Sequence, residues 1–496
     1  MRLSYNVDGQ VTSKELGTVN SQSDADWPGF SMVQQASSGY DGMGRKVWDA
    51  MTGGGAIQAL SQYSYDSASR PDCAAVRLNQ AAYLSLPGSA CTLTAVGGDG
   101  SYDRISQNTY NAADQVTKVT DALGTSGLRG TQVTTQEAVY LATGAVDKLK
   151  DAGGRTTQYE YDGFGRVTKI TYPHPSSIGQ VNSGDYESFT YDAASRVTGM
   201  RMRNGVNATL AYDALGRLAQ KSTLPASGGE TISYTYDNLG RVLTLSNGSQ
   251  TITYTYDALG RRKTETGPLG QVASDYDVAG RRIKVTWPGG FHVNYDYDTA
   301  GNLKAVRENG ATSGAGVLVG FSYDSLGRRT GAAFGNGVTT GYGYDALSRL
   351  SSLTLNPAGT GQDQHVGFSY NRAGQITGRD SSNESYTRPI PSKVDRSYAI
   401  DGLNRVTSVT SHQTGGNSTA PLSYGGGQSL TGDGSVSFGY DPENRLTSGN
   451  GATLAYDPAG RLYQVSKSAT ARFLYDGPDI IAEYDGSGNL LRRYVH

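Results

Sequence analysis

The sequence predicts an all-β protein in which tandem hairpins form one long, curled antiparallel sheet. Three observations carry this prediction. The pattern YDxxGR recurs along the chain, the residues around each copy alternate between polar and apolar, and glycine and tyrosine supply 67 and 34 of the 496 residues. Glycine is the residue of tight turns, and tyrosine suits strands that have one apolar end and one hydrated end.

The repeat covers nearly the whole chain. Full copies of YDxxGR begin at Tyr40, Tyr161, Tyr212, Tyr236, Tyr256, Tyr276, Tyr323 and Tyr456, and degenerate copies begin at Tyr5, Tyr65, Tyr110, Tyr191, Tyr297, Tyr344, Tyr370 and Tyr440. Between Tyr191 and Tyr370, successive tyrosines are 20 to 26 residues apart. One structural unit therefore occupies about twenty residues.

Each unit reads as one hairpin, as residues 231–261 illustrate. Ile232, Tyr234 and Tyr236 alternate with polar residues, which is the period-two pattern of a strand with two different faces. Asp237 can bond its own backbone at the first position of a type I turn, and Gly240 can adopt the positive φ of the bulge that closes the hairpin. The spacing of aspartate and glycine thus predicts a YD turn, our name for the six residues of each YDxxGR copy.

A second kind of turn returns the chain between copies. Asn247-Gly248 predicts a type I′ turn into the next hairpin. Similar pairs are Asn204-Gly205, Asn309-Gly310, Asn336-Gly337 and Gly289-Gly290. The YD turns and these return turns should lie at opposite edges of the sheet. Because Tyr236 and Arg241 flank the YD turn, we expect the guanidinium to lie on that ring or to bond Asp237.

The signature residues of the repeat are therefore assigned to structure. They are Tyr161, Asp162, Gly165, Arg166, Tyr212, Asp213, Gly216, Arg217, Tyr236, Asp237, Gly240, Arg241, Tyr256, Asp257, Gly260, Arg261, Tyr276, Asp277, Gly280, Arg281, Tyr323, Asp324, Gly327, Arg328, Tyr456, Asp457, Gly460 and Arg461.

The repeat rhythm predicts five segments. Residues 1–70 hold degenerate copies, 71–100 form an irregular insertion, 101–377 form the main array, 378–397 form a loop or insertion, and 398–496 hold further copies. The only cysteines, Cys73 and Cys91, lie in the first insertion. Their spacing fits one local disulfide, and it lacks the CxxC pairs of metal sites. Neither end resembles a capping unit, so we expect a piece of a longer protein.

Composition and motifs argue against several functions. The net charge of −2 and pI near 6.2 provide no basic stripe for nucleic acid or anionic lipid. No apolar run is long enough for a membrane span, and the N-terminus lacks the features of a signal peptide. The five histidines have no HxH or HExxH spacing, and the glycine-rich stretches lack the GK[ST] of a phosphate loop. We predict no catalytic residue, cofactor or metal, and no enzyme activity.

The YDxxGR units, their period and their coverage resemble the YD repeats of the Rhs family, and more distantly those of toxin-complex and teneurin shells. The ending FLYDGPDIIAEYDGSGNLLRRYVH (473–496) is similar to the segment that leads into the Rhs-associated core. The resemblance implies a β-sheet shell, or cocoon, around a C-terminal toxin domain of an exported or cell-surface bacterial polymorphic toxin used in interbacterial competition. Its partners would be that toxin domain and the rest of the shell, with the secretion apparatus or cell-surface glycans as further candidates.

Two alternatives remain open at this stage. The tyrosine-rich sheet could instead belong to an adhesion module that binds carbohydrate or a cell surface. For the fold, the rival is a β-propeller, in which two units would form each four-stranded blade.

Overall fold

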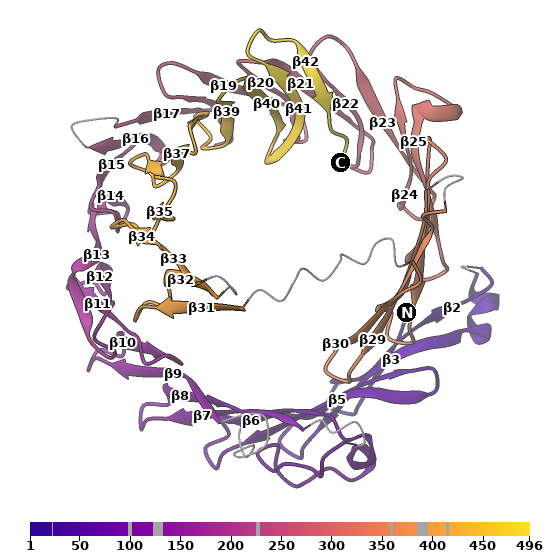
Figure 1. Ribbon diagram of the computed structural model, residues 1–496. Coiled ribbons are helices and arrows are strands. Elements are labelled where there is room, and N and C mark those ends of the chain that lie inside the picture. Colours follow the sequence, from indigo (N-terminus) through magenta and orange to yellow (C-terminus); the bar gives the residue numbers. More distant parts are fainter. Residues whose placement is uncertain are drawn as a thin grey trace. The chain divides into compact units, whose positions relative to one another are not determined.

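The computed structural model describes residues 1–496 except 22, 98–101, 123–131, 225–228, 358–360, 384–394 and 413–415. Within the described ranges the chain holds 42 strands, three short 3₁₀ helices and no α-helix (Figure 1). The predicted all-β class is therefore confirmed. No helix in these ranges has the length and hydrophobicity needed to cross a lipid bilayer.

The chain divides into two compact units. Unit 1 comprises Met1–Val139, Asp296–Arg307 and Ala311–Pro389, and unit 2 comprises Tyr140–Tyr295, Glu308–Gly310 and Ile390–His496. Each unit contains a longer earlier run of strands and a later run, which we call its first and second strips.

The first strip of unit 1 contains β1 (Arg2–Tyr5), β2 (Val11–Thr18), η1 (Asp24–Gly29), β3 (Ser31–Tyr40), β4 (Lys46–Gly53), β5 (Ala56–Tyr65), β6 (Pro71–Arg77), η2 (Gln80–Leu84), β7 (Arg104–Tyr110), β8 (Val116–Asp121) and β9 (Val133–Tyr140). Its second strip contains β24 (Leu303–Glu308), η3 (Gly314–Gly316), β25 (Val317–Tyr323), β26 (Arg329–Phe334), β27 (Thr339–Tyr344), β28 (Leu350–Asn356), β29 (Gln364–Tyr370) and β30 (Ile376–Ser381).

The first strip of unit 2 contains β10 (Val146–Asp151), β11 (Thr156–Tyr161), β12 (Val167–Pro173), β13 (Val181–Tyr191), β14 (Val197–Arg201), β15 (Asn207–Tyr212), β16 (Leu218–Leu224), β17 (Thr231–Tyr236), β18 (Val242–Ser246), β19 (Thr251–Tyr256), β20 (Arg262–Gly267), β21 (Gly270–Tyr276), β22 (Arg282–Thr286) and β23 (His292–Tyr297). Its second strip contains β31 (Asp395–Ile400), β32 (Val406–His412), β33 (Ser418–Pro421), β34 (Ser423–Tyr424), β35 (Leu430–Gly432), β36 (Gly439–Tyr440), β37 (Leu446–Gly449), β38 (Ala452–Tyr456), β39 (Leu462–Ser466), β40 (Thr470–Asp476), β41 (Asp479–Asp485) and β42 (Leu490–Arg493).

Strands pair with their neighbours in the sequence, which is the topology of a meander. For example, β17 pairs antiparallel with β18, β18 with β19, and β19 with β20. Strands β1 to β30 belong to a single thirty-stranded sheet, and the later residues form sheets of three, two and seven strands. A propeller would divide the strands into separate four-stranded blades. The propeller alternative is therefore wrong, and the long antiparallel sheet is confirmed.

The segment expected to be an irregular insertion begins as a strand. Residues 71–77 form β6, which pairs with β5 and β7, because the YD turn at 65–70 sends the chain back along β5. Cys73 of β6 and Cys91, which follows η2, are joined in a disulfide with a Cα–Cα distance of 5.3 Å. In the second expected insertion, residues 378–381 complete β30, whereas 384–394 lie outside the described residues.

Large apolar cores are rare in the described chain. The buried apolar clusters are small, such as Cys73, Ala75, Ala90 and Ile105, which pack beneath the disulfide-linked segment. Next to this cluster, Arg77 and Asp103 form a buried ion pair at 2.7 Å. Because the side chains of most strands are only partly buried, the stability of the sheet depends on contacts along its edges and between adjacent hairpins.

Candidate functional site: the YD turns and the seams between strips

The YD turn has the geometry expected from its aspartate and glycine. At Tyr256–Arg261, Gly260 has a φ of +83° and its N–H donates to the Asp257 carbonyl at 3.0 Å. The Asp257 carboxylate accepts from the backbone N–H of Leu259 at 3.0 Å and of Arg261 at 2.9 Å. The strand register shifts between Thr255 and Tyr256. This is a type I turn closed by a bulge.

Degenerate copies keep the same backbone. The glycine position is occupied by other residues that still have φ between 61° and 65°, namely Ser69, Asp114, Ser195, Ser348, Asn404 and Asn444. Hairpin geometry therefore persists where the sequence signature is incomplete, although a side chain at such a φ is under strain.

Not every return turn has the predicted type I′ geometry, as residues 247–250 show. At Asn247-Gly248 only Gly248 has a positive φ, of +85°, whereas a type I′ turn needs positive φ at both central residues. The Asn247 N–H donates to the Gln250 carbonyl, so Gly248 takes the first central position. That pattern is typical of a type II′ turn. The type I′ assignment is wrong here because Asn247 caps the turn with its side chain, which accepts from the N–H of Gln250 at 2.8 Å.

The conserved arginine links successive hairpins. Arg241 pairs with Asp237 of its own turn at 2.5 Å, as expected. Its guanidinium does not stack on Tyr236, however; it lies 4.6 Å from the ring centroid of Tyr256, in the next hairpin. The Tyr256 hydroxyl donates back to the Val242 carbonyl at 2.8 Å. The predicted contact with the hairpin's own tyrosine is wrong, because that ring is covered by the arginine of the preceding hairpin, Arg217.

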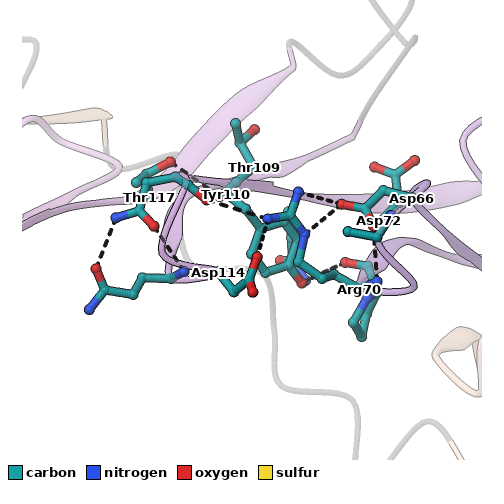
Figure 2. Close-up of polar contacts among 12 residues, drawn as sticks. Asp66, Arg70, Asp72, Thr109, Tyr110, Asp114 and Thr117 are labelled. Atoms are coloured by element: carbon teal, nitrogen blue, oxygen red, sulfur yellow. Dashed lines mark hydrogen bonds and ion pairs between the residues drawn. The ribbon is translucent and has the colours of Figure 1, made fainter. Parts of the chain in front are cut away.

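Figure 2 shows the same arrangement at Arg70. This guanidinium bonds Asp66 of its own turn and reaches Asp114 of the next turn at 2.6 Å. Its carbon lies 4.5 Å from the Tyr110 ring centroid, and the Tyr110 hydroxyl donates to the Pro71 carbonyl at 2.7 Å. The Arg70 side chain thus bonds the aspartate of its own turn and contacts both Tyr110 and Asp114 of the next turn.

This contact recurs along both units, and we call it the arginine ladder. The ring distances are 4.5 to 4.9 Å in the pairs Arg45–Tyr65, Arg70–Tyr110, Arg166–Tyr191, Arg196–Tyr212, Arg217–Tyr236, Arg241–Tyr256, Arg261–Tyr276, Arg328–Tyr344, Arg349–Tyr370, Arg405–Tyr424, Arg445–Tyr456 and Arg461–Tyr475. In each pair the tyrosine hydroxyl donates to the carbonyl of the residue after the arginine.

The ladder also sets the charge state of the turn. The hydrogen bond from the Arg166 guanidinium lowers the pKa of the Asp162 carboxyl, and the backbone N–H of Arg166 adds to this effect against the opposing effect of burial. In the next turn the backbone N–H of Arg196 and then its guanidinium lower the pKa of Asp192. Asp162 and Asp192 are therefore held in their charged form.

A seam joins the two strips of unit 2, where YD turns of the second strip contact return turns and strands of the first. Arg461 bonds Asp457 of its own turn and also Glu265 of β20, at 2.6 Å. Glu265 accepts in addition from Arg262 at 2.6 Å and from the Gly477 N–H at 3.1 Å. The Glu265 and Asp457 side chains are each only 4% exposed, so the cluster is buried.

The same seam continues along the neighbouring strands. Asp476 pairs with Arg262 and Arg282, and the Trp287 indole donates to the Ile481 carbonyl at 2.9 Å. Figure 1 shows β39 to β42 beside β19 to β22. No sequence pattern predicted these contacts, which join residues about two hundred positions apart; Trp287 and Ile481, for example, are separated by 194 positions.

Unit 1 has a seam of the same kind. The Gln34 amide of β3 donates to the Ala346 carbonyl at 2.8 Å and to the Ser348 hydroxyl at 2.7 Å, both in a YD turn. Arg372, in the next YD turn, donates to the Gln58 carbonyl at 3.3 Å. In both units, therefore, YD turns of the second strip dock on the edge of the first strip that carries the return turns.

Two family models match parts of the sequence. The model described as Teneurin YD-shell matches residues 219–308, and the model described as RHS Repeat matches residues 140–175. These matches confirm the resemblance of the repeats to the Rhs/YD-repeat family in the two matched stretches. No curated protein sequence matches this chain.

Solved structures share the fold of this chain. The crystal structures described as TcdB2-TccC3-TEV and TcdB2-TccC3 each have a TM-score of 0.62 and 14% identity, over 98% and 99% of this chain. A mutant Photorhabdus luminescens Tc holotoxin pore has a TM-score of 0.57 and 13% identity over 97%. The chain spans only 28% to 29% of the chains in those structures. At these identities the similarity shows the fold.

The signature residues of the YD-repeat array are thus engaged in turn, ladder and seam contacts. In the described part of the chain, one group of cysteine and acidic residues is close enough to hold a metal ion, namely Asp72, Cys73 and Cys91. Both cysteine sulfurs are bonded to each other, so neither is a thiolate ligand there.

Proposed function

We propose that this chain is a wall segment of an Rhs-type shell that encloses a C-terminal toxin domain of the same protein. One observation carries the proposal: wherever a repeat keeps its signature, the four signature residues hold hairpin to hairpin, in a ladder that is present within each unit. A wall that keeps a cargo from solvent needs such continuity, because each exposed strand edge is a site where a sheet can open or aggregate.

The exposure of some YD turns supports an extension of the sheet wall, in which the edge of a further strip would dock on these turns. In YD turns of a second strip that contact the first strip, an apolar residue of the turn is covered. Leu347 and Leu403, which precede the glycine position, are partly buried, and Pro458, two residues before that position, is buried. In the first strip of unit 2 the corresponding residues are open, with exposed fractions of 86% for Phe164 and 78% for Leu239. An apolar edge of this kind fits a further strip of the same shell.

The proposal includes an exported or cell-surface role for the full-length protein and no catalysis by this segment. Its partners would be the enclosed toxin domain and the rest of the shell. The disulfide between Cys73 and Cys91 supports residence in an oxidising compartment.

Protease protection tests the enclosure. The chain would be joined to the downstream core and toxin domain of an Rhs-type protein, and the half-life of the toxin domain under protease would be measured. Deletion of residues 231–330 should shorten that half-life to the value for the free toxin domain, whereas an exposed single substitution such as Lys263→Ala should leave it unchanged. Equal protection with and without the hairpins would reject enclosure and favour the adhesion module.

A further inference from the structure

One turn of the second strip of unit 2 lacks the side chains that make the ladder. Residues 424–429 keep the YD backbone: the Gly425 N–H donates to the Ser429 carbonyl at 2.9 Å, the Gln428 N–H donates to the Gly425 carbonyl at 3.0 Å, and Gln428 has a φ of +64°. Yet Gly425 stands in place of the aspartate and Ser429 in place of the arginine. This turn has neither the internal ion pair nor a guanidinium for the next ring.

The seam closes on both sides of this turn. On one side, the Gly402 N–H donates to the Pro175 carbonyl at 2.6 Å. On the other side, the Asn204 amide donates to the Pro442 carbonyl at 2.9 Å, and Arg445 pairs with Glu230 at 2.8 Å. The degenerate turn therefore interrupts the backbone hydrogen bonds and ion pairs by which its neighbours close the seam, and a remaining contact is the Gln428 oxygen, which accepts from the Arg203 guanidinium of the first strip at 3.0 Å.

A cavity of about 330 Å³ lies at this interruption, between β13 and β14 of the first strip and the 424–429 turn. Through Asn204, Gly425 and Gly426 it adjoins a second hollow of about 350 Å³. Both volumes fall within the range of about 300 to 1,000 Å³ that is usual for small-molecule sites. The strands that border the cavity are labelled in Figure 1.

Positive charge exceeds negative charge in the lining. Three arginines line the cavity, and two of them are neutralised: Arg203 pairs with Asp185 at 2.7 Å, and Arg405 pairs with Asp401 at 2.7 Å. Arg201 donates to the carbonyls of Tyr186 and Met202 and stacks on the Tyr186 ring at 3.9 Å. Within the described part of the chain, no carboxylate pairs with Arg201.

The remaining lining is polar and suits hydroxyl groups. Asn182, Asn204 and Gln428 contribute amides, and the glycines at 425 and 426 expose backbone. The Asn182 oxygen accepts from the Gly184 N–H, the Asn204 amide bonds Pro442 and Val206, and the Gln428 oxygen accepts from Arg203, so the remaining amide hydrogens and lone pairs would bind a ligand. An arginine that lacks a carboxylate partner favours a ligand carboxylate, since guanidinium and carboxylate match in shape and charge.

We propose that this cavity is a binding site for a saccharide that carries a carboxylate, a uronate. Arg201 would bind the carboxylate, and the amides would bind the ring hydroxyls. A uronate fits the lining better than an acidic peptide side chain, because amide groups and backbone border the cavity beyond the arginine and continue into the adjoining hollow. This inference is independent of the enclosure proposed above.

Equilibrium dialysis of the full chain with labelled galacturonate, galactose and N-acetyl-aspartate amide tests the site. Galacturonate should be retained, whereas galactose, which lacks the carboxylate, and the acidic amino-acid probe, which lacks the ring hydroxyls, should each bind at least about tenfold more weakly. Arg201→Gln should weaken galacturonate binding by a similar factor. Arg379→Gln, which removes an exposed arginine of β30, is the matched control and should bind as the native chain does.

A second variant separates loss of the site from loss of the fold. The double substitution Gly425→Asp and Ser429→Arg restores the aspartate and the arginine of the YD signature, so it should stabilise the turn while its new side chains occupy the cavity. We expect an unchanged or higher melting temperature together with loss of galacturonate binding. Undiminished binding in this variant, no binding to the native chain, or equal or tighter binding of galactose or of the acidic amino-acid probe would each overturn the proposal.

Discussion

The guanidinium of Arg241 lies 4.6 Å from the ring centroid of Tyr256, a residue of the following hairpin, and the Tyr256 hydroxyl donates to the carbonyl of Val242, the residue after that arginine. The two residues therefore hold each other's hairpins by a stacking contact and a hydrogen bond. Because the same pair recurs in both units, the stability of the sheet should depend on the arginine more than its partly exposed position suggests.

Replacement of Arg241 tests this dependence. Arg241→Ala should lower the free energy of unfolding by about 1 to 2 kcal/mol, because it removes a cation–π contact and the ion pair with Asp237. Arg241→Lys should recover only part of this loss, since an ammonium lacks the planar fork. Lys263→Ala, at an exposed position of β20, is the control and should change stability by less than about 0.5 kcal/mol. Equal effects of Arg241→Ala and Lys263→Ala in urea denaturation would contradict the ladder.

The turn glycine gives a second prediction. Gly260 has a φ of +83°, a region that β-branched residues avoid, so Gly260→Val should cost about 1 to 3 kcal/mol. Gly260→Asn should cost less, because Asn404 and Asn444 adopt a φ of 63° and 65° at the same place in other turns. Thermal unfolding of the two variants compares them directly, and a smaller loss for valine than for asparagine would show that backbone strain is not the cause.

Some copies of the YD turn have an uncharged Asn–Gln pair in place of the Asp–Arg ion pair, and from them we predict the outcome of a double-mutant cycle. At Asn111–Gln115 and Asn371–Gln375 an amide pair replaces the ion pair, with donor–acceptor distances of 2.9 and 3.0 Å. Asp257→Asn and Arg261→Gln should therefore each destabilise the chain when made alone. Combined, they should destabilise it less than the sum of the two, by about 0.5 kcal/mol or more. Strict additivity in denaturant titrations would mean that the two side chains do not act as a pair.

The buried cluster of the unit 2 seam gives the largest expected effect. Glu265 is buried and bonds both Arg262 and Arg461, so Glu265→Gln leaves two guanidinium groups without that carboxylate. We expect a loss of about 3 kcal/mol or more and faster proteolysis within the second strip. Glu160→Gln is the matched control, because the Glu160 side chain is 52% exposed where it pairs with Lys169. Similar proteolysis of the two variants would show that Glu265 does not hold the seam.

The turn carboxylates predict acid sensitivity. The pKa values of Asp162 and Asp192 lie below the ordinary 3.8 in the folded chain. A group with a lowered folded-state pKa favours the fold above its ordinary pKa, and this contribution disappears as the pH falls through the folded-state pKa. The melting temperature should therefore vary little between about pH 7 and pH 5 and fall below about pH 4. The Asp257→Asn, Arg261→Gln double variant should show a shallower fall, and a steeper one would argue against the turn carboxylates as the cause.

Local features of this fold could be predicted from sequence, whereas the partners of several side chains could not. Asp257 and Gly260 specify the YD turn because both act within six residues of backbone. The partner of Arg241 was ambiguous, since Tyr236 and Tyr256 are chemically alike and the pairing depends on how adjacent strands are registered. The turn at Asn247 was misassigned because Asn-Gly pairs serve more than one turn type.

The seam contacts escaped prediction for a different reason. Glu265 and Arg461 are 196 positions apart, and no local pattern marks either residue as a partner of the other. Their meeting depends on the path of every hairpin between them. The cavity at 424–429 shows the converse, because the departure of that copy from the signature was visible in the sequence but its consequence required the seam around it.

The arginine ladder has a consequence for how such a protein can change in evolution. Each hairpin that keeps the YD signature presents the same tyrosine to its predecessor and the same arginine to its successor, so repeats that keep it are interchangeable as neighbours. A gene duplication that inserts one repeat would supply both of its new junctions with the correct partners at once. Unequal recombination between repeats could thus lengthen or shorten the strip in steps of one hairpin. The length of the sheet could then vary between related proteins while the contacts between adjacent hairpins stay the same.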